Sequence, residues 1–296
     1  MPIERIAILG TGLIGASVGL ALRSHGFAGE IGGWDPDPEE LAIAVERGAV
    51  HFGSSDGLAA AESSDVTVLC GPVFTILEWM ERLAPVLKPG QLVTDVGSVK
   101  GALVEWARGR YNLKDSAGFL PGHPMAGKEV SGATNADADL FDGAAWLFTE
   151  TAETRAMHPE SRVLADDWRG WVEKMHCRVI DLDPQRHDAL CAWVSHLPQF
   201  VSTALSALLE DEFAEKDEML AIGGRALREM TRLGASPYSM WRDVAHTNTE
   251  AIAASLLALE QRLTHLRENL KTPELREEFE RANQFRAGMA STKNTL

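Results

Sequence analysis

Residues 6–15, Ile-Ala-Ile-Leu-Gly-Thr-Gly-Leu-Ile-Gly, decide the fold of the N-terminal half of this chain. The stretch joins a short apolar run to the pattern G-x-G-x-x-G and to the start of a helical pattern. In dinucleotide-binding domains the first glycine permits a tight turn, the second admits a pyrophosphate to the backbone, and the third allows close contact between helix and strand. The N–H groups that open the helix attract the phosphates. We therefore predict a dinucleotide site that contains Gly10, Gly12, Leu13, Ile14 and Gly15.

Asp35 follows the second strand candidate and lies 20 residues after Gly15. An acid at this spacing accepts hydrogen bonds from the ribose hydroxyls of NAD and repels the 2′-phosphate of NADP. Asp37 is a second acid in the same turn, so we predict NAD as the cofactor. The alternative is that Asp35 only caps the helix after Pro36. We also assign Gly71 and Pro72, at the end of a later strand candidate, to the cofactor site.

The composition is that of a globular protein of 296 residues, with 45% hydrophobic and 24% charged residues and enough length for two domains. The net charge of −15 argues against nucleic acid or an anionic membrane surface as a partner. Three scattered cysteines lack metal-ligand spacing, so we expect reduced thiols, no metal site and a cytoplasmic location. The first strand candidate begins at residue 3 and no apolar run approaches membrane-spanning length. We therefore expect neither a signal peptide nor a transmembrane helix.

Residues 1–182 alternate strand candidates with amphipathic helices, which predicts an α/β, doubly wound (Rossmann) domain with ligands at the carboxyl ends of parallel strands. The strand candidates are residues 3–9, 30–35, 66–71, 92–95, 118–121 and 144–149. Helical candidates between them include residues 38–47, 74–84 and 99–108. A helix at 159–175 leads to residues 178–181, which we expect to add one more strand to the same sheet.

From residue 183 onward the strand signals stop. Helical patterns cover about residues 185–212, 215–233, 237–265 and 273–285. We therefore predict a second, all-α domain over residues 183–296. These helices carry more apolar surface than one small helical layer is able to bury, which favours a dimer.

Three further motifs carry polar residues at places where ligands bind. Asp-Val-Gly-Ser-Val-Lys at residues 95–100 ends a strand candidate, where Ser98 either caps the next helix or belongs to a site. Gly-His-Pro at residues 122–124 holds His123 in a restricted loop, where a neutral imidazole accepts protons near neutral pH. A core role for His123 is equally open on local grounds. In residues 195–199, Pro198 interrupts a helix and predicts a kink beside a site.

Together these motifs resemble the prephenate/arogenate dehydrogenase family of tyrosine biosynthesis. The resemblance covers nearly the whole chain and rests on five ordered segments, at residues 10–19, 95–101, 122–133, 187–198 and 230–244. It implies a Rossmann NAD-binding domain followed by a helical domain through which two subunits dimerise. It also implies an NAD-dependent oxidative decarboxylation of prephenate, a small-molecule substrate, to 4-hydroxyphenylpyruvate.

The resemblance also assigns roles to individual residues. His123 matches the catalytic histidine that accepts the ring hydroxyl proton, and Ser98 matches the serine that hydrogen-bonds this hydroxyl and orients the histidine. Arg232 matches the arginine that binds a substrate carboxylate, whereas its chemistry alone suggests a solvated charge at a helix end. Further matches near the substrate are Glu129, Trp241, His187 and His196; for the two histidines a packing role is about as well supported as a catalytic one.

Two departures from the family pattern affect the expected substrate. Many members have a histidine where this chain has Gln199, and a glycine triplet where this chain has Gly223-Gly224-Arg225. Arg225 would add a cation near the site. The neutral amide of Gln199 favours prephenate over arogenate, whose ammonium would gain from a nearby carboxylate. The alternatives are an arogenate dehydrogenase, a non-catalytic NAD-binding regulator or another hydroxyacid dehydrogenase. The family's regulatory and mutase domains are not recognised, so we expect a single activity.

Overall fold

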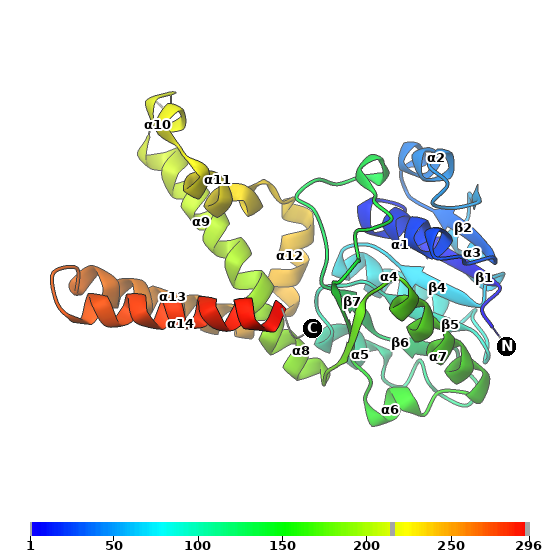
Figure 1. Cartoon of the computed structure of the whole chain (residues 1–296). Coiled ribbons are helices and arrows are strands. Elements are labelled where there is room, and N and C mark those ends of the chain that lie inside the picture. Colours follow the sequence, from blue (N-terminus) through cyan, green and yellow to red (C-terminus); the bar gives the residue numbers. More distant parts are fainter. Residues whose placement is uncertain (1, 214–216, 294–296) are drawn as a thin grey trace. The chain divides into compact units, whose positions relative to one another are not determined.

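A parallel sheet forms the centre of the N-terminal region in the computed structural model, which describes residues 2–213 and 217–293 (Figure 1). Within these residues, six strands pair in the order β3-β2-β1-β4-β5-β6, all parallel to their neighbours. Their bounds are β1 (Arg5–Leu9), β2 (Glu30–Trp34), β3 (Phe52–Gly53), β4 (Val66–Leu69), β5 (Leu92–Asp95) and β6 (Gly118–Leu120). This is the strand order of doubly wound dinucleotide-binding folds. The predicted fold class is confirmed.

The central strands are buried along their length because helices cover the sheet on both faces. All four residues of β4 and of β5 are buried, as are residues 6–9 of β1. The helices of this region are α1 (Leu13–Ser24), α2 (Pro38–Glu46), α3 (Gly57–Glu62), α4 (Val73–Leu83), α5 (Gly101–Ala107), α6 (Ala152–Arg155) and α7 (Pro159–Lys174). The short strand β3 and helix α3 lie between predicted elements and carry too few periodic residues to be predicted.

The strand order reverses between β1 and β4, and this reversal positions the cofactor site. The loops that follow these two strands contain Gly10–Gly12 and Gly71–Pro72, and they lie side by side at the carboxyl ends of the strands. The Cys70 N–H donates to the Leu9 carbonyl at 2.8 Å, which joins the two strand ends. Ligands of doubly wound folds bind in the crevice at such a reversal.

The prediction of a single sheet is wrong. The described residues form a second, three-stranded sheet from β7 (Gly122–Pro124), β8 (Ala145–Phe148) and β9 (Arg178–Asp181). β7 pairs antiparallel with β8, and β8 pairs parallel with β9, so residues 178–181 form a strand but do not extend the large sheet. Apolar periodicity identifies strands but does not specify their partners. Here the chain leaves the large sheet at Pro121 and starts a new one at Gly122.

The remainder of the described chain is helical, as predicted. Its elements are α8 (Pro184–Cys191), a π-helical segment η2 (Ala192–His196), α9 (Leu197–Glu212), α10 (Asp217–Ile222), α11 (Arg225–Thr231), a 3-10 turn η3 (Arg232–Ala235), α12 (Tyr238–Thr247), α13 (Thr249–Glu268) and α14 (Glu274–Lys293). The π-helical segment comes directly before Pro198, where we predicted an irregular helix. No described helix is both long and apolar enough to cross a membrane.

Contacts divide the chain into two compact units, residues 1–249 and residues 250–296. In the first unit, α8 packs on α5 and α12 packs on α4, so these helices adjoin the sheet-bearing region. In the second unit, Arg262 of α13 pairs with Glu278 of α14 at 2.6 Å. The domain boundary after residue 182 stays a prediction, based on the change from strands to helices.

Candidate functional site

The glycine loop has the geometry that a bound dinucleotide needs. Gly10 adopts a φ of +100°, and a Cβ there would lie 1.8 Å from the Cys70 carbonyl oxygen. A Cβ on Gly15 would lie 1.9 Å from the Gly10 carbonyl oxygen. A Cβ on Gly12 would meet no atom within 4 Å. The protein's own packing therefore requires Gly10 and Gly15, whereas Gly12 borders open space at the first turn of α1, where a pyrophosphate fits.

Asp35 lies beside this loop and does not cap α2. Its carboxylate accepts hydrogen bonds from the Thr11 N–H at 2.6 Å and the Asp37 N–H at 3.0 Å. Asp37 is the cap of α2, since its side chain accepts from the Glu39 N–H at 2.9 Å. The capping alternative for Asp35 is therefore wrong. Burial raises the pKa of Asp35, and the nearby Glu40 carboxylate also raises it. These surroundings suit ribose hydroxyls and disfavour a 2′-phosphate.

A buried ion pair joins the two ends of the motif at residues 95–100, directly after β5. Asp95 and Lys100 are both fully buried, and the Lys100 ammonium donates to the Asp95 carboxylate. That carboxylate also accepts from the Gly97 N–H at 2.8 Å and the Gly122 N–H at 3.1 Å. Burial lowers the pKa of Lys100, while Asp95 opposes this shift. Removing one partner of such a pair leaves a buried charge and costs about 3–5 kcal/mol.

Ser98 lies between these two residues and does not cap the next helix. Helix α5 begins at Gly101, and its cap residue Lys100 makes no side-chain capping bond. Instead, the Asp188 carboxylate of α8 accepts from the Lys100 N–H and the Gly101 N–H, each at 2.8 Å. The capping alternative for Ser98 is wrong. The Asp188 carboxylate, distant in sequence, caps α5 in place of the Ser98 hydroxyl.

His123 lies in a strand and not in the loop that we predicted. It occupies the middle of β7, opposite Leu147 of β8, and is 6% exposed. Its Nδ1 lies 2.9 Å from Nε2 of His187. Burial lowers the pKa of His123 well below its ordinary value, with further lowering by His187, Lys100 and His196. The imidazole is therefore held neutral, as a proton acceptor must be.

His187 continues this chain of buried groups. Its Nδ1 lies 2.8 Å from Oδ1 of Asp188, and burial lowers its pKa. Cys191, one turn further along α8, places its sulfur 3.6 Å from Nε2 of His187 and 4.0 Å from Nδ1 of His123. Burial raises the pKa of this thiol to about 12, so it stays protonated. Two buried histidines and a carboxylate thus form one hydrogen-bonded series.

His196 and Trp241 lie on the helical side of the same region. The His196 ring is fully buried, and burial lowers its pKa to about 4. The backbone of Ser98 lies close enough to affect the same pKa. The rings of His196 and Trp241 pack edge to face with centroids 5.9 Å apart. The indole N–H of Trp241 is buried and has no hydrogen-bond partner among the described residues, so it is available to a ligand.

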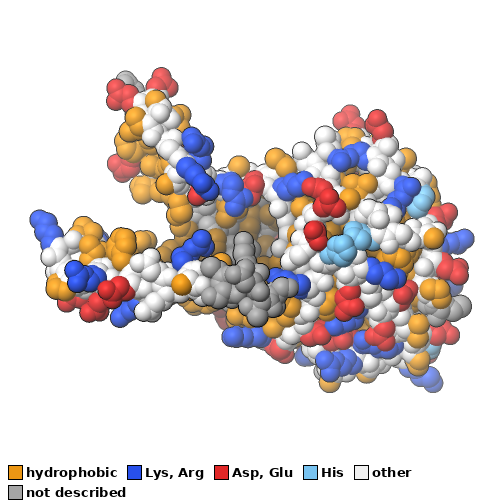
Figure 2. Space-filling model, in the orientation of Figure 1, with side chains coloured by type: hydrophobic (Ala, Val, Ile, Leu, Met, Phe, Trp, Pro, Cys, Tyr) orange, Lys and Arg blue, Asp and Glu red, His pale blue; other side chains and the backbone are white. Residues whose placement is uncertain are grey.

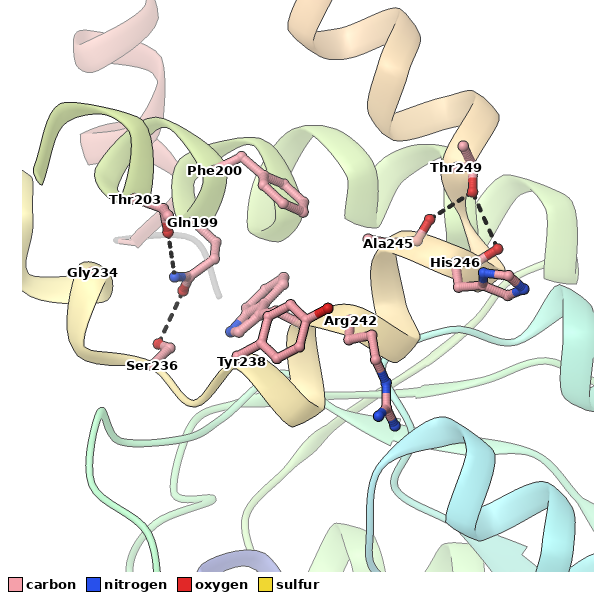
Figure 3. A pocket seen from close by; sticks show the side chains of 11 residues that line it. Gln199, Phe200, Thr203, Gly234, Ser236, Tyr238, Arg242, Ala245, His246 and Thr249 are labelled. Atoms are coloured by element: carbon pink, nitrogen blue, oxygen red, sulfur yellow. Dashed lines mark hydrogen bonds between the residues drawn. The ribbon is translucent and has the colours of Figure 1, made fainter. Parts of the chain in front are cut away.

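A pocket of about 450 Å³ lies between α9 and α12, and Gln199, Phe200 and Tyr238 line it (Figure 3). Trp241 also lines this pocket. Gln199 is buried, and its amide already has partners in the protein. It donates to the Leu233 carbonyl at 2.7 Å and the Thr203 hydroxyl at 3.2 Å, and it accepts from the Ser236 hydroxyl at 3.0 Å. These bonds attach η3 to α9. A direct contact between Gln199 and the substrate stays a prediction.

Arg232 begins η3 and forms an ion pair with Glu129 of the loop after β7. The structure thus brings together two residues predicted to lie near the substrate, and both stay partly exposed. Arg225, the cation expected near the site, is strongly exposed and pairs with Glu229 on its own helix at 2.6 Å.

Two family descriptions match this chain, one on each side of the change from strands to helices. "Prephenate dehydrogenase, nucleotide-binding domain" matches residues 18–165, and "Prephenate dehydrogenase, dimerization domain" matches residues 183–289. The chain belongs to the prephenate dehydrogenase family. The resemblance inferred from the motifs is confirmed, and the site described above is that of a family member.

Relatives in this family agree in sequence and in structure. A prephenate dehydrogenase of Lactococcus lactis is 33% identical over 251 residues, which cover 83% of this chain and 66% of the relative. This chain spans slightly less than two thirds of the length of that relative and of a Bacillus subtilis prephenate dehydrogenase. The structure of Synechocystis arogenate dehydrogenase is 31% identical, with a TM-score of 0.74 over 96% of this chain and 99% of that one. A prephenate dehydrogenase from A. aeolicus, in complex with hydroxyphenyl propionate and NAD+, is 29% identical, with a TM-score of 0.80 over 99% of this chain and 98% of that one.

The structure places the predicted residues of this family member in three groups. The glycine loop and Asp35 form the first, and the buried histidines with the Ser98 backbone form the second. The third contains Gln199, Arg232 and Glu129. Sequence reasoning missed Lys100, Asp95 and Asp188 as parts of the site. The only available signal was their position inside the matched segments 95–101 and 187–198.

Replacing Gly12 with Ala separates cofactor binding from folding. We expect Gly12→Ala to keep its unfolding temperature, because the new Cβ meets no protein atom. Its affinity for NAD should fall at least about tenfold, or 1.4 kcal/mol. Gly15→Ala is the matched control and should destabilise the unliganded protein by about 1–3 kcal/mol, since its Cβ collides with backbone. Thermal unfolding and NAD titration check both; wild-type NAD affinity in Gly12→Ala would refute the assignment.

We expect the pH dependence of turnover to report the protonation of His123, the predicted catalytic base. A protonated imidazole is unable to accept a proton, so kcat/KM falls as the pH drops through the pKa of His123. Because that pKa lies well below 6.5, kcat/KM should stay level down to pH 6.5 and decline only at lower pH. His187, His196 and Lys100 lower this pKa, whereas Asp188 raises the pKa values of His187 and His196. An acid limb centred at or above pH 6.5 would contradict the assignment.

Proposed function

We propose that this chain is an NAD-dependent dehydrogenase that oxidatively decarboxylates prephenate to 4-hydroxyphenylpyruvate. The observation that carries the proposal is His123, a buried imidazole whose pKa is held below its ordinary value, in a member of the prephenate dehydrogenase family. The names of the Lactococcus and Bacillus relatives support the substrate. The complex of the A. aeolicus enzyme with NAD+ supports the cofactor.

The chemistry of prephenate explains why one neutral base is needed. Its cyclohexadiene ring carries a hydroxyl on one carbon and a carboxylate on the opposite carbon. NAD+, when bound, accepts a hydride from the carbon that bears the hydroxyl. His123 takes the hydroxyl proton as that carbon becomes a carbonyl. The bond between ring and carboxylate then breaks, CO2 leaves, and the electron pair makes the ring an aromatic phenolate. The phenolate takes the proton back from His123, so no net proton is released.

Other residues bind and orient the reactants in this proposal. The cofactor is held by the glycine loop, by Asp35 and by the Gly71–Pro72 turn. Ser98 hydrogen-bonds the ring hydroxyl, and Arg232 binds a carboxylate through its planar guanidinium. The residues assigned to the remaining substrate surface are Glu129, His196, Gln199 and Trp241. The ion pair of Arg232 with Glu129 means that the substrate carboxylate competes with Glu129 for the guanidinium.

Arogenate is the second candidate substrate, because the Synechocystis structure is that of an arogenate dehydrogenase. The two substrates differ only in the side chain, where arogenate has an ammonium and prephenate a ketone. Gln199 offers no negative charge to an ammonium, which favours prephenate. A carboxylate at this position would also face the Leu233 carbonyl, to which the Gln199 amide donates. We therefore expect Gln199→Glu to disturb η3 as well as selectivity.

Steady-state assays of the purified protein test the proposal directly. We expect the highest kcat/KM with prephenate and NAD, and a lower value with arogenate or with NADP. Preference for arogenate would refute the argument from Gln199, and equal use of NADP would refute the argument from Asp35. Absence of turnover with all four combinations, in protein that binds NAD, would favour a non-catalytic NAD-binding regulator.

Arg232 gives a specific prediction for substrate affinity. We expect Arg232→Gln to raise the KM for prephenate about tenfold, or 1.4 kcal/mol, because the exposed guanidinium is only partly desolvated in the free protein. The KM for NAD should stay within a factor of about two. Arg225→Gln is the matched control, since Arg225 is an exposed arginine that pairs with Glu229 of its own helix. An equal rise in both KM values would indicate a structural role for Arg232.

We also propose that the protein is a homodimer in the cytoplasm. The match of residues 183–289 to the family's dimerization domain supports the dimer. Hydrophobic side chains gather on α9–α11 and, separately, on α13 and α14 (Figure 2). Exposed examples include Leu208, Ile222, Met230, Leu263, Phe279 and Phe285. Light scattering at micromolar concentration should give twice the chain mass of 32.2 kDa, and a monomer would contradict the dimer. The cytoplasmic location rests on the three free cysteines.

A further inference from the structure

The hydrogen bonds of the buried histidines determine where their protons lie. Asp188 is 9% exposed, and both of its carboxylate oxygens accept backbone N–H groups of α5. A carboxylate that accepts these bonds has only acceptor capacity left for His187, so Nδ1 of His187 carries a proton. The pKa of His187 is lowered by burial, so its ring is neutral and Nε2 has a lone pair. That lone pair faces Nδ1 of His123 at 2.9 Å.

The same reasoning applies one residue further along the series. Because Nε2 of His187 accepts, Nδ1 of His123 donates and must carry the proton. The remaining nitrogen of His123, Nε2, is then unprotonated. We propose that Asp188, acting through His187, fixes His123 in the tautomer whose Nε2 accepts the substrate proton, which makes Asp188 and His187 positioning residues. This inference rests on the proposed function of His123 as a base.

Asp188 also positions the loop that contains Ser98. Its two oxygens hold the N–H groups of Lys100 and Gly101, directly after the Ser98 turn. A Cβ on Gly101 would lie 2.8 Å from Oδ2 of Asp188, so glycine permits this close approach. One carboxylate from α8 therefore fixes both the orientation of His123 and the position of Ser98. Both residues then contact the same substrate hydroxyl in the proposed reaction.

A metal ion is the competing explanation for this cluster. The ligand atoms of His123, His187 and Cys191 all lie within 4.8 Å of one another. A bound ion would use the nitrogens that now share a hydrogen bond, and it would remove the proton between them. The Lys100 ammonium acts on both histidines and disfavours another cation there. The charges thus favour a proton over a metal at this position.

The tautomer of His123 is measurable without reference to activity. We expect two-bond ¹H–¹⁵N spectra of the histidine-labelled protein at neutral pH to show His123 and His187 protonated at Nδ1, with signals assigned through His123→Gln and His187→Gln. A native His123 that carries its proton on Nε2 would overturn the proposal even if the enzyme turns over prephenate. Conversely, the predicted tautomer without turnover would refute the proposed function and leave the tautomer assignment standing. A stoichiometric metal ion in the purified native protein would also overturn the proposal.

Asp188→Asn tests whether Asp188 controls the tautomer of His123 through His187. An amide has one acceptor oxygen for the three donors that the carboxylate serves, so we expect His187 to lose its fixed Nδ1–H tautomer, His123 to populate the Nε2–H tautomer, and kcat to fall about 100- to 10,000-fold. The KM for NAD should change less than about threefold, which also shows that the variant is folded. Asp243→Asn is the matched control, because Asp243 is a buried carboxylate of α12 that accepts the Phe74 N–H of α4 at 3.1 Å. It should leave the histidine tautomers unchanged. Native tautomers and native kcat in Asp188→Asn would overturn the proposal.

Discussion

The Asp95 carboxylate is the constraint on which the rest of the site depends. It lies at the end of a central strand, fully buried, and it accepts from the Gly97 N–H, the Gly122 N–H and the Lys100 ammonium. These three bonds connect the large sheet to the Ser98 turn, to the first residue of β7 and to the start of α5. The two motifs that carry Ser98 and His123 are therefore attached to one side chain. The bond to the Gly122 N–H thus connects the strand that contains His123 to the end of β5.

The helical region completes the site by supplying carboxylates to the sheet-bearing region. Asp188 of α8 holds the first N–H groups of α5, and Asp243 of α12 holds the Phe74 N–H in α4. Helices α4 and α5 start after the carboxyl ends of β4 and β5, where ligands of this fold bind. Asp188 thus holds the turn that contains Ser98, and Asp243 holds the first turn of α4. A shift of α8 or α12 relative to the large sheet would therefore disturb the hydrogen bonds that hold the starts of α5 and α4.

The sequence predicts the cofactor half much better than the substrate half, and the reason is locality. The roles of Gly10, Gly12 and Gly15 follow from one turn of backbone, and the spacing to Asp35 follows from one strand and one helix. The His123–His187–Asp188 series joins residues 64 positions apart, and the Gln199–Ser236 bond joins residues 37 apart. No local pattern encodes such contacts. The second sheet was missed for the same reason, because apolar alternation in residues 144–149 and 178–181 does not specify a partner.

The π-helical segment at residues 192–196 sets the angular relation between two groups of side chains. An α-helix advances about 100° per residue, so one extra residue in a turn rotates everything after it by that amount. His187 precedes the segment and faces His123, whereas His196 ends it and packs against Trp241. If the same residues formed a regular α-helical turn, Gln199 and Phe200 would be rotated by about that amount, away from the pocket that they line. The winding of this one turn therefore determines which side chains of α9 reach the pocket, independently of the identity of those side chains.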